Sequence, residues 1–141
     1  MGSVDLDSII VTNQRRIQSN GGHVLHAMKR GDEGYKGFGE VYFSSVNPLA
    51  VKAWKKHQRM TLNLVVPVGT ILFVFVDEEG NKREEIIGVE RYARLTVPPK
   101  VWFGFKGIGK SDNVLMNFAD IPHDPNEVTA VSRESIQHDW G

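Results

Sequence analysis

Polar side chains that could bind a ligand occupy every second position between residues 55 and 63. These residues are Lys55, His57, Arg59, Thr61 and Asn63. Alternation with a period of two is typical of a β-strand, so the five side chains are predicted to share one face. Three basic groups and two neutral hydrogen-bonding groups suit an anionic ligand rich in hydroxyl groups. A phosphorylated sugar is the simplest ligand of this kind.

This polar stripe has two interpretations. In a partly dry barrel the pKa of Lys55 or His57 could fall toward neutrality, so that either could serve as a general base while Arg59 or Lys52 binds phosphate. The alternative is a solvated outer face, which is the usual setting for a run of charges. Trp54 identifies a packed face and leaves the odd-numbered positions to a cavity or to solvent.

A second group of candidate residues follows two prolines in the segment 98–105. The prolines fix the start of a strand, and Trp102, Phe103 and Phe105 supply flat apolar surface. Such rings can stack on a nucleotide base or on the C–H face of a sugar. They can equally belong to the core, which is the commoner place for residues of these types.

The composition limits the possible functions. A chain of 141 residues is long enough for one domain with a core, and 17 basic residues balance 17 acidic ones. No global charge therefore attracts nucleic acid or a membrane surface. The chain has no cysteine, which excludes a thiolate nucleophile and a disulfide framework. No secretory signal is visible at the N-terminus, so a cytoplasmic location is expected.

Metal binding is not expected from the histidines. His23 and His26 are three residues apart on an expected strand, so their side chains point to opposite faces. No His-x-His pair occurs, and His57 has no carboxylate within six residues on either side. A metal site is therefore not predicted.

The elements that must position these residues are short strands. β-Rich runs recur about every ten residues between turn residues, as in a sandwich or barrel. Strands are predicted at residues 8–13, 23–28, 38–44, 50–54, 61–66, 70–76, 84–89, 94–97, 101–105 and 113–118. The run 71–76 is apolar on both faces, which predicts burial either between two sheets or at a subunit contact. The polar tail after residue 119 is predicted to be mostly irregular, with a helical turn near 132–135.

The order of several motifs resembles that of a known family. Val-Lys-Ala-Trp at 51–54, Arg-Leu-Thr-Val-Pro-Pro at 94–99 and Asp-Pro-Asn-Glu at 124–127 occur in the order found in dTDP-4-dehydrorhamnose 3,5-epimerases. The resemblance runs from about Phe38 to Trp140. It implies an all-β cupin, a double-stranded β-helix or jelly-roll, with one domain over residues 1–141. The core would span about 8–118 and the tail 119–141.

The resemblance also implies a function. Members of that family act as homodimers, without metal, on nucleoside-diphosphate 4-keto-6-deoxysugars in surface polysaccharide synthesis. Their chemistry removes a proton next to the C4 ketone and returns one from the opposite face. It therefore requires a base, an acid and cations for the diphosphate.

This chain departs from the family at the positions that matter most. The residue that matches the base histidine is Lys55, and a second family histidine falls on Phe103. The residue that matches the tyrosine acid is Met116. Lys52 keeps the basic character of the first motif, and Asp139 matches an aspartate that normally orients the base.

We therefore expect an epimerase-like or isomerase-like cupin that acts on a nucleotide-linked ketosugar and uses no cofactor. Lys55 and His57 are the predicted proton-transfer residues, with Asp139 as their orienting group. The predicted substrate-binding residues are Tyr42, Lys52, Arg59, Asn63, Trp102 and Asn117. Among them Tyr42 is the best remaining phenol, provided that it faces the cavity. One alternative is a binding module or partner subunit that has lost catalysis, and another is a structural protein that binds no sugar nucleotide.

Overall fold

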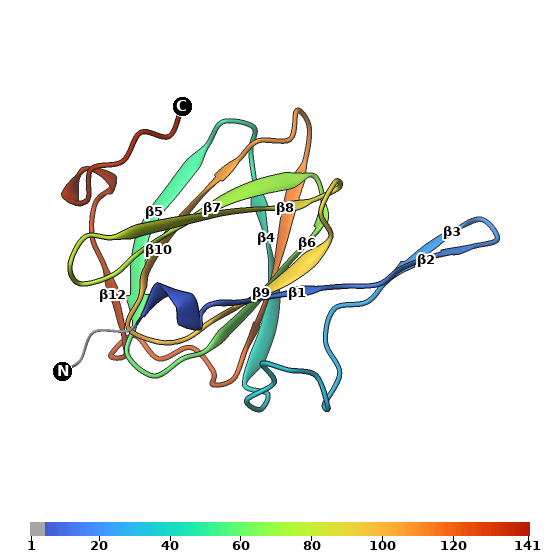
Figure 1. The fold of residues 1–141 in the computed structure, drawn as a ribbon, viewed down its shortest axis with the longest axis horizontal. Helices are drawn as coiled ribbons and strands as arrows, with labels where there is room; N and C mark the ends of the chain where they lie inside the picture. The colour runs from blue at the N-terminus through green and yellow to red at the C-terminus, as the bar shows by residue number, and fades with distance from the viewer. Residues whose placement is uncertain (1–4) are drawn as a thin grey trace.

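Two antiparallel sheets of five strands each face one another in the computed structural model, which describes residues 5–141 (Figure 1). The first, called here the β4 sheet, has the order β1 (Ile10–Asn13), β9 (Ala93–Val97), β6 (Leu62–Val68), β11 (Asn113–Ala119) and β4 (Glu40–Val46). The second, called the β5 sheet, has the order β12 (Val128–Ala130), β5 (Val51–His57), β10 (Trp102–Gly107), β7 (Thr70–Val76) and β8 (Lys82–Gly88). The predicted all-β architecture is confirmed.

The remaining elements are small. The strands β2 (Arg16–Ser19) and β3 (Gly22–Leu25) form a hairpin that projects away from the two sheets (Figure 1). Two 3₁₀ helices, η1 (Leu6–Ser8) and η2 (Arg133–Ser135), complete the described chain. No helix in residues 5–141 is long and apolar enough to cross a membrane. Residues 1–4, which belong to the segment used to predict the absence of a secretory signal, lie outside the described residues.

The core lies between the two sheets because alternate side chains of facing strands point toward each other. Leu62 and Leu64 of β6 enter it from the β4 sheet, and Phe73 and Phe75 of β7 enter it from the β5 sheet. All four side chains are at most 1% exposed. Such burial of apolar surface is the main force that holds the two sheets together.

The outer face of β7 is also buried, as its doubly apolar sequence predicts. Val74 and Val76 pack outside the β5 sheet with Trp54 and with Trp140 from the C-terminal tail. The sequence left open whether this face is buried between two sheets or at a subunit contact, and in the structure the C-terminal tail of the same chain packs on it. A homodimer stays a prediction.

Each of the ten predicted strands overlaps an observed one, and the helical turn near 132–135 is confirmed as η2. The strands β2 and β12 were missed because both are short and most of their side chains are exposed, so neither has a clear apolar face. The predicted strand 8–13 begins too early, since the chain forms η1 before β1. The predicted strand 50–54 ends too early, since β5 continues to His57.

Asn113, at the start of β11, joins three segments at one end of the barrel. Its side-chain oxygen accepts hydrogen bonds from the backbone N–H of Thr70 at 2.9 Å and of Gly109 at 3.1 Å. Its amide nitrogen donates to the carbonyl of Val46 at 3.0 Å. The residue is fully buried, so water cannot replace these bonds.

We expect Asn113→Ala to destabilise the protein by about 2–4 kcal/mol, because the substitution leaves several buried backbone groups without partners. Urea unfolding followed by fluorescence measures the change. Asn126→Ala, at an exposed position, is the matched control and should stay within about 0.5 kcal/mol of the unsubstituted protein. Equal stability of the two variants would contradict the structural role of Asn113.

Candidate active site

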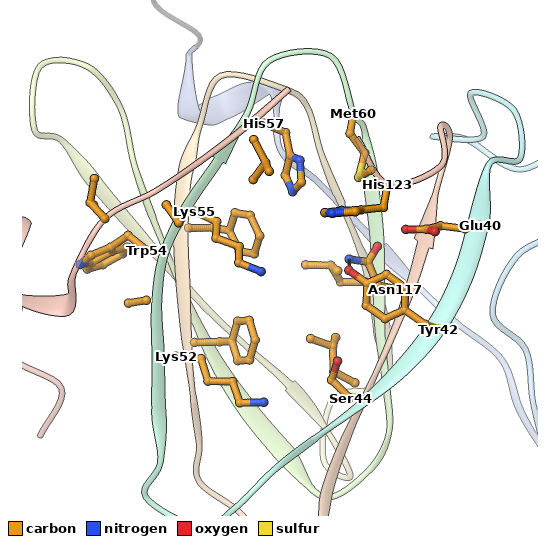
Figure 2. A pocket seen from close by; sticks show the side chains of 18 residues that line it. Glu40, Tyr42, Ser44, Lys52, Trp54, Lys55, His57, Met60, Asn117 and His123 are labelled. Carbon is orange, nitrogen blue, oxygen red and sulfur yellow. Dashed lines mark hydrogen bonds between the residues drawn. The ribbon is translucent and has the colours of Figure 1, made fainter. Parts of the chain in front are cut away.

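A cavity of about 410 Å³ lies between the two sheets (Figure 2). Phe103, Phe105, Leu64 and Leu115 form much of its apolar surface. Its polar lining residues are Glu40, Tyr42, Ser44, Lys52, Lys55, His57, Asn117 and His123. In residues 5–141 no three His, Cys, Asp or Glu side chains are grouped closely enough to hold a metal ion.

One wall of the cavity is basic and comes from β5. Lys52, Lys55 and His57 all point into the cavity, although strict alternation would place the two lysines on opposite faces (Figure 2). The register of β5 against β10 shifts by one residue between the pairs Gly104–Ala53 and Phe103–Lys55. This β-bulge inserts one residue into β5 and returns Lys55 to the face of Lys52.

The two lysines differ in their contacts. The Nζ atom of Lys52 donates to the carbonyl of Ser45 at 3.1 Å. Among the described residues, the Lys55 ammonium has neither a hydrogen-bond nor an ion-pair partner. Lys55 therefore offers the cavity all three of its donors.

His57 is held by a buried carboxylate. Its Nδ1 atom hydrogen-bonds Oε1 of Glu127, whose side chain is 2% exposed. The second oxygen of Glu127 accepts from the backbone N–H groups of Gln58 at 3.1 Å, Arg59 at 3.0 Å and Met60 at 3.2 Å. With Nδ1 engaged, Nε2 is the ring nitrogen of His57 that can exchange a proton with a ligand.

The surroundings of Glu127 keep it ionised. Burial alone would raise the pKa of this carboxyl group, but the hydrogen bond from the Arg59 backbone and the contacts with His57 outweigh burial. The net result is a pKa below its ordinary value of 4.5. An ionised Glu127 orients the imidazole of His57 through the contact with Nδ1.

The opposite wall comes from the β4 sheet. Tyr42 of β4 and Asn117 of β11 are directly paired across the two strands. The Nδ2 atom of Asn117 donates to the Tyr42 hydroxyl at 3.1 Å. Burial raises the pKa of Tyr42, an effect that the Asn117 hydrogen bond partly offsets and nearby Glu40 reinforces. Tyr42 therefore keeps its proton at neutral pH, and it faces the cavity as expected (Figure 2).

The predicted placement of Arg59 in the cavity is wrong. The segment 55–63 is not one strand, because β5 ends at His57 and the chain bends before β6 begins at Leu62 in the other sheet. Arg59 lies in the bend, where its Nη2 atom forms an ion pair with Asp124 at 3.0 Å. Its side chain is 59% exposed.

The predicted placement of Asn63 is wrong for the same reason. After the bend the even-numbered residues of β6, such as Leu64, face the cavity, so Asn63 faces the opposite side of its sheet. There its amide nitrogen donates to the carbonyl of Gly34 at 3.0 Å. Its oxygen accepts from the Thr96 hydroxyl at 2.6 Å.

Trp102 and Asp139 also lie outside the cavity. Trp102 packs on the outer face of the β5 sheet, with the Nζ atom of Lys56 over its ring at 4.8 Å, while the next residue, Phe103, faces inward. The tail that carries Asp139 crosses this same outer face, and the Asp139 side chain accepts from the backbone of Gly141. The predicted role of Asp139 as the group that orients the base is therefore wrong.

The sequence analysis missed the carboxylate that does contact His57. Glu127 lies 70 residues further along the chain, whereas the search for a partner covered only six residues on either side. The sequence did contain an indication of this residue, because Glu127 ends the Asp-Pro-Asn-Glu motif on which the family resemblance rests. Glu40, Ser44 and His123 were also missed as lining residues.

Comparisons with known proteins give the following relatives. No family model matches the chain. The chain is similar to the crystal structure of a dTDP sugar isomerase from Desulfovibrio desulfuricans, with 35% identity and a TM-score of 0.90 over 95% of this chain and 91% of that one. It is also similar to a probable low-salt glycan biosynthesis epimerase from Haloferax volcanii, with 27% identity over 105 residues, or 69% of this chain and 67% of the relative.

More distant structures share the fold. One is a 3,4-ketoisomerase mutant from Thermoanaerobacterium thermosaccharolyticum in complex with TDP-4-keto-6-deoxyglucose, at 15% identity and a TM-score of 0.76 over 89% of this chain and 88% of that one. Another is the dTDP-4-dehydrorhamnose 3,5-epimerase from Sulfolobus tokodaii, at 20% identity and a TM-score of 0.82 over 98% of this chain and 84% of that one. Together with the dTDP sugar isomerase, they confirm the predicted jelly-roll.

The contacts of Glu127 predict how stability depends on pH. The pKa of Glu127 is lower in the folded protein than in the unfolded chain, so the ionised carboxylate stabilises the folded protein fully above about pH 4.5. This stabilisation is lost as the pH falls through the folded-state pKa. Glu127→Gln should therefore lower stability at neutral pH, and its difference from the unsubstituted protein should shrink in acid. Urea midpoints measured from neutral pH into acid test this expectation.

Glu134→Gln is the matched control, since Glu134 is exposed. It should leave the acid dependence of stability unchanged. A difference between Glu127→Gln and the unsubstituted protein that grows as the pH falls would contradict the prediction.

Proposed function

We propose that this chain, which belongs to the cupin family of dTDP-sugar epimerases and isomerases, catalyses metal-free proton transfer on a nucleoside-diphosphate 4-keto-6-deoxysugar. The observation that carries the proposal is the imidazole of His57, backed by buried Glu127, inside a cavity with two lysines. The relative from Haloferax volcanii, a probable glycan biosynthesis epimerase, supports a role in surface polysaccharide synthesis.

His57 is the proposed base. A C–H group next to a ketone loses its proton when a base lies within reach and the resulting negative charge is stabilised. Ionised Glu127 holds Nδ1 of His57, so the ring presents Nε2 as the atom that takes the proton. Proton transfer was predicted for both Lys55 and His57. Of the two, only His57 has a carboxylate partner, so we assign removal of the C–H proton to His57.

The lysines are the proposed cationic groups. When the C–H proton leaves, negative charge develops on the ketone oxygen, and an ammonium group in a partly apolar cavity stabilises that charge strongly. Lys55 lies two residues before His57 on the same face of β5 and has free donors, so we assign it to this oxygen. Lys52, further along the same wall (Figure 2), is assigned to the diphosphate.

Tyr42 is the proposed acid. It lies across the cavity from His57 and Lys55, and its raised pKa keeps the phenol protonated (Figure 2). A base on one side of the sugar ring and an acid on the other allow a proton to be removed from one face and returned to the other. Inversion at one carbon is the simplest result of such an exchange.

The first test measures exchange with solvent. We expect the protein in D₂O to introduce deuterium into dTDP-4-keto-6-deoxyglucose, as detected by mass spectrometry. His57→Asn should slow the exchange by about 10²-fold or more, the usual contribution of a general base. His23→Asn, on the projecting hairpin, is the control and should exchange normally. Tight binding without exchange in the unsubstituted protein would favour a binding module instead.

The second test separates proton removal from proton return. Tyr42→Phe keeps His57 and should still exchange deuterium into the sugar, but it should form the new isomer at least about 10²-fold more slowly. Tyr35→Phe is the control because Tyr35 is not among the cavity-lining residues. Simultaneous loss of exchange and product in Tyr42→Phe would contradict its assignment as the acid.

A further inference from the structure

We infer that Asn117 determines which sugar is accepted, because its side-chain oxygen receives a hydrogen bond from one hydroxyl group of the bound sugar. This inference rests on the proposed function, since it names the part of the same ligand that the β4 sheet recognises. It concerns binding and not proton transfer, so the two can be tested separately.

Asn117 carries a buried hydrogen-bond acceptor that no described residue contacts. Asn117 lines the cavity and is 6% exposed. Its Nδ2 atom is committed to the Tyr42 hydroxyl at 3.1 Å, but its Oδ1 atom is buried and has no hydrogen-bond partner among the described residues. A buried amide oxygen without a partner is costly, and in native proteins such an atom usually marks a place for water or a ligand.

The surroundings decide which ligand group fits there. On this wall Asn117 has Glu40 nearby, whose carboxylate is also an acceptor and also lines the cavity (Figure 2). A ligand group that hydrogen-bonds either acceptor must have a hydrogen to donate. A ketone oxygen and an ionised phosphate have no hydrogen to donate, so they are directed to Lys52 and Lys55 on the opposite wall.

A sugar hydroxyl matches the unpaired oxygen of Asn117. The hydroxyl donates its hydrogen to Oδ1 of Asn117, while the phenol hydrogen of Tyr42, which Asn117 does not use, stays available for the proposed acid role. A sugar that lacks this hydroxyl leaves Oδ1 buried and unpaired in the complex. Sites that hydrogen-bond a substrate hydroxyl reject the analogue without that hydroxyl much more strongly than purely apolar pockets reject a ligand of slightly different shape.

The experiment uses stable ligands and measures affinity by calorimetry. The probes are dTDP, dTDP-glucose and three dTDP-glucose analogues in which hydrogen replaces the hydroxyl at C2, C3 or C4. We expect one of the three analogues to bind the unsubstituted protein at least about tenfold more weakly than dTDP-glucose, a loss of about one hydrogen bond. The other analogues should lose less.

Variants of Asn117 identify the acceptor. Asn117→Leu should bind dTDP-glucose and the discriminated analogue equally well, whereas Asn117→Asp, which keeps an oxygen at this position, should retain the discrimination. Should Asn117→Leu fail to fold, Asn117→Ala gives the same comparison. Asn126→Leu, at an exposed position, is the control and should behave like the unsubstituted protein.

The possible results separate this inference from the proposed function. The inference is overturned if the unsubstituted protein binds all the analogues as tightly as dTDP-glucose, or if Asn117→Leu still binds one analogue more weakly. In either case, deuterium exchange would still support the proposed function. If neither dTDP nor any of the dTDP-sugars binds and no exchange occurs, the proposed function fails, and the inference fails with it.

Discussion

The site depends on one buried carboxylate at the corner between the two sheets. Glu127 accepts hydrogen bonds from three consecutive backbone N–H groups, those of residues 58–60, where the chain leaves β5 and turns toward β6. The same carboxylate holds the ring of His57, the last residue of β5. The path of the chain and the orientation of the proposed base are therefore set by a single side chain. Burial of its charge is tolerated because four donors surround it.

This corner also explains where prediction from the sequence failed. The alternation from Lys55 to Asn63 predicts one strand, because a period of two is a local pattern and the four residues between β5 and β6, 58–61, do not interrupt it. The bend moves the chain to the other sheet and changes which positions face inward. Lys55 and His57 keep the predicted direction, whereas Arg59 and Asn63 do not.

The parts that were predictable are those that neighbouring residues determine. The strands, the doubly buried β7 and the shared face of Lys55 and His57 all follow from local patterns of apolar and polar residues. Contacts between distant segments were not predictable in this way. The aspartate suggested by the resemblance, Asp139, lies outside the β5 sheet, while Glu127 reaches His57 from inside. Likewise, the bulge in β5 depends on its pairing with β10, which the sequence of β5 alone does not reveal.

The two walls of the cavity belong to different sheets, and this separation affects how the protein could diverge. Lys52, Lys55 and His57 stand on β5, whereas Asn117 and Tyr42 stand on β11 and β4. Substitutions on β11 or β4 can therefore alter ligand preference without rebuilding the β5 strand on the facing sheet. Asn117 is the residue on the β4 sheet to which no proton transfer is assigned, so a new specificity could evolve there while His57, Lys55 and Tyr42 are retained.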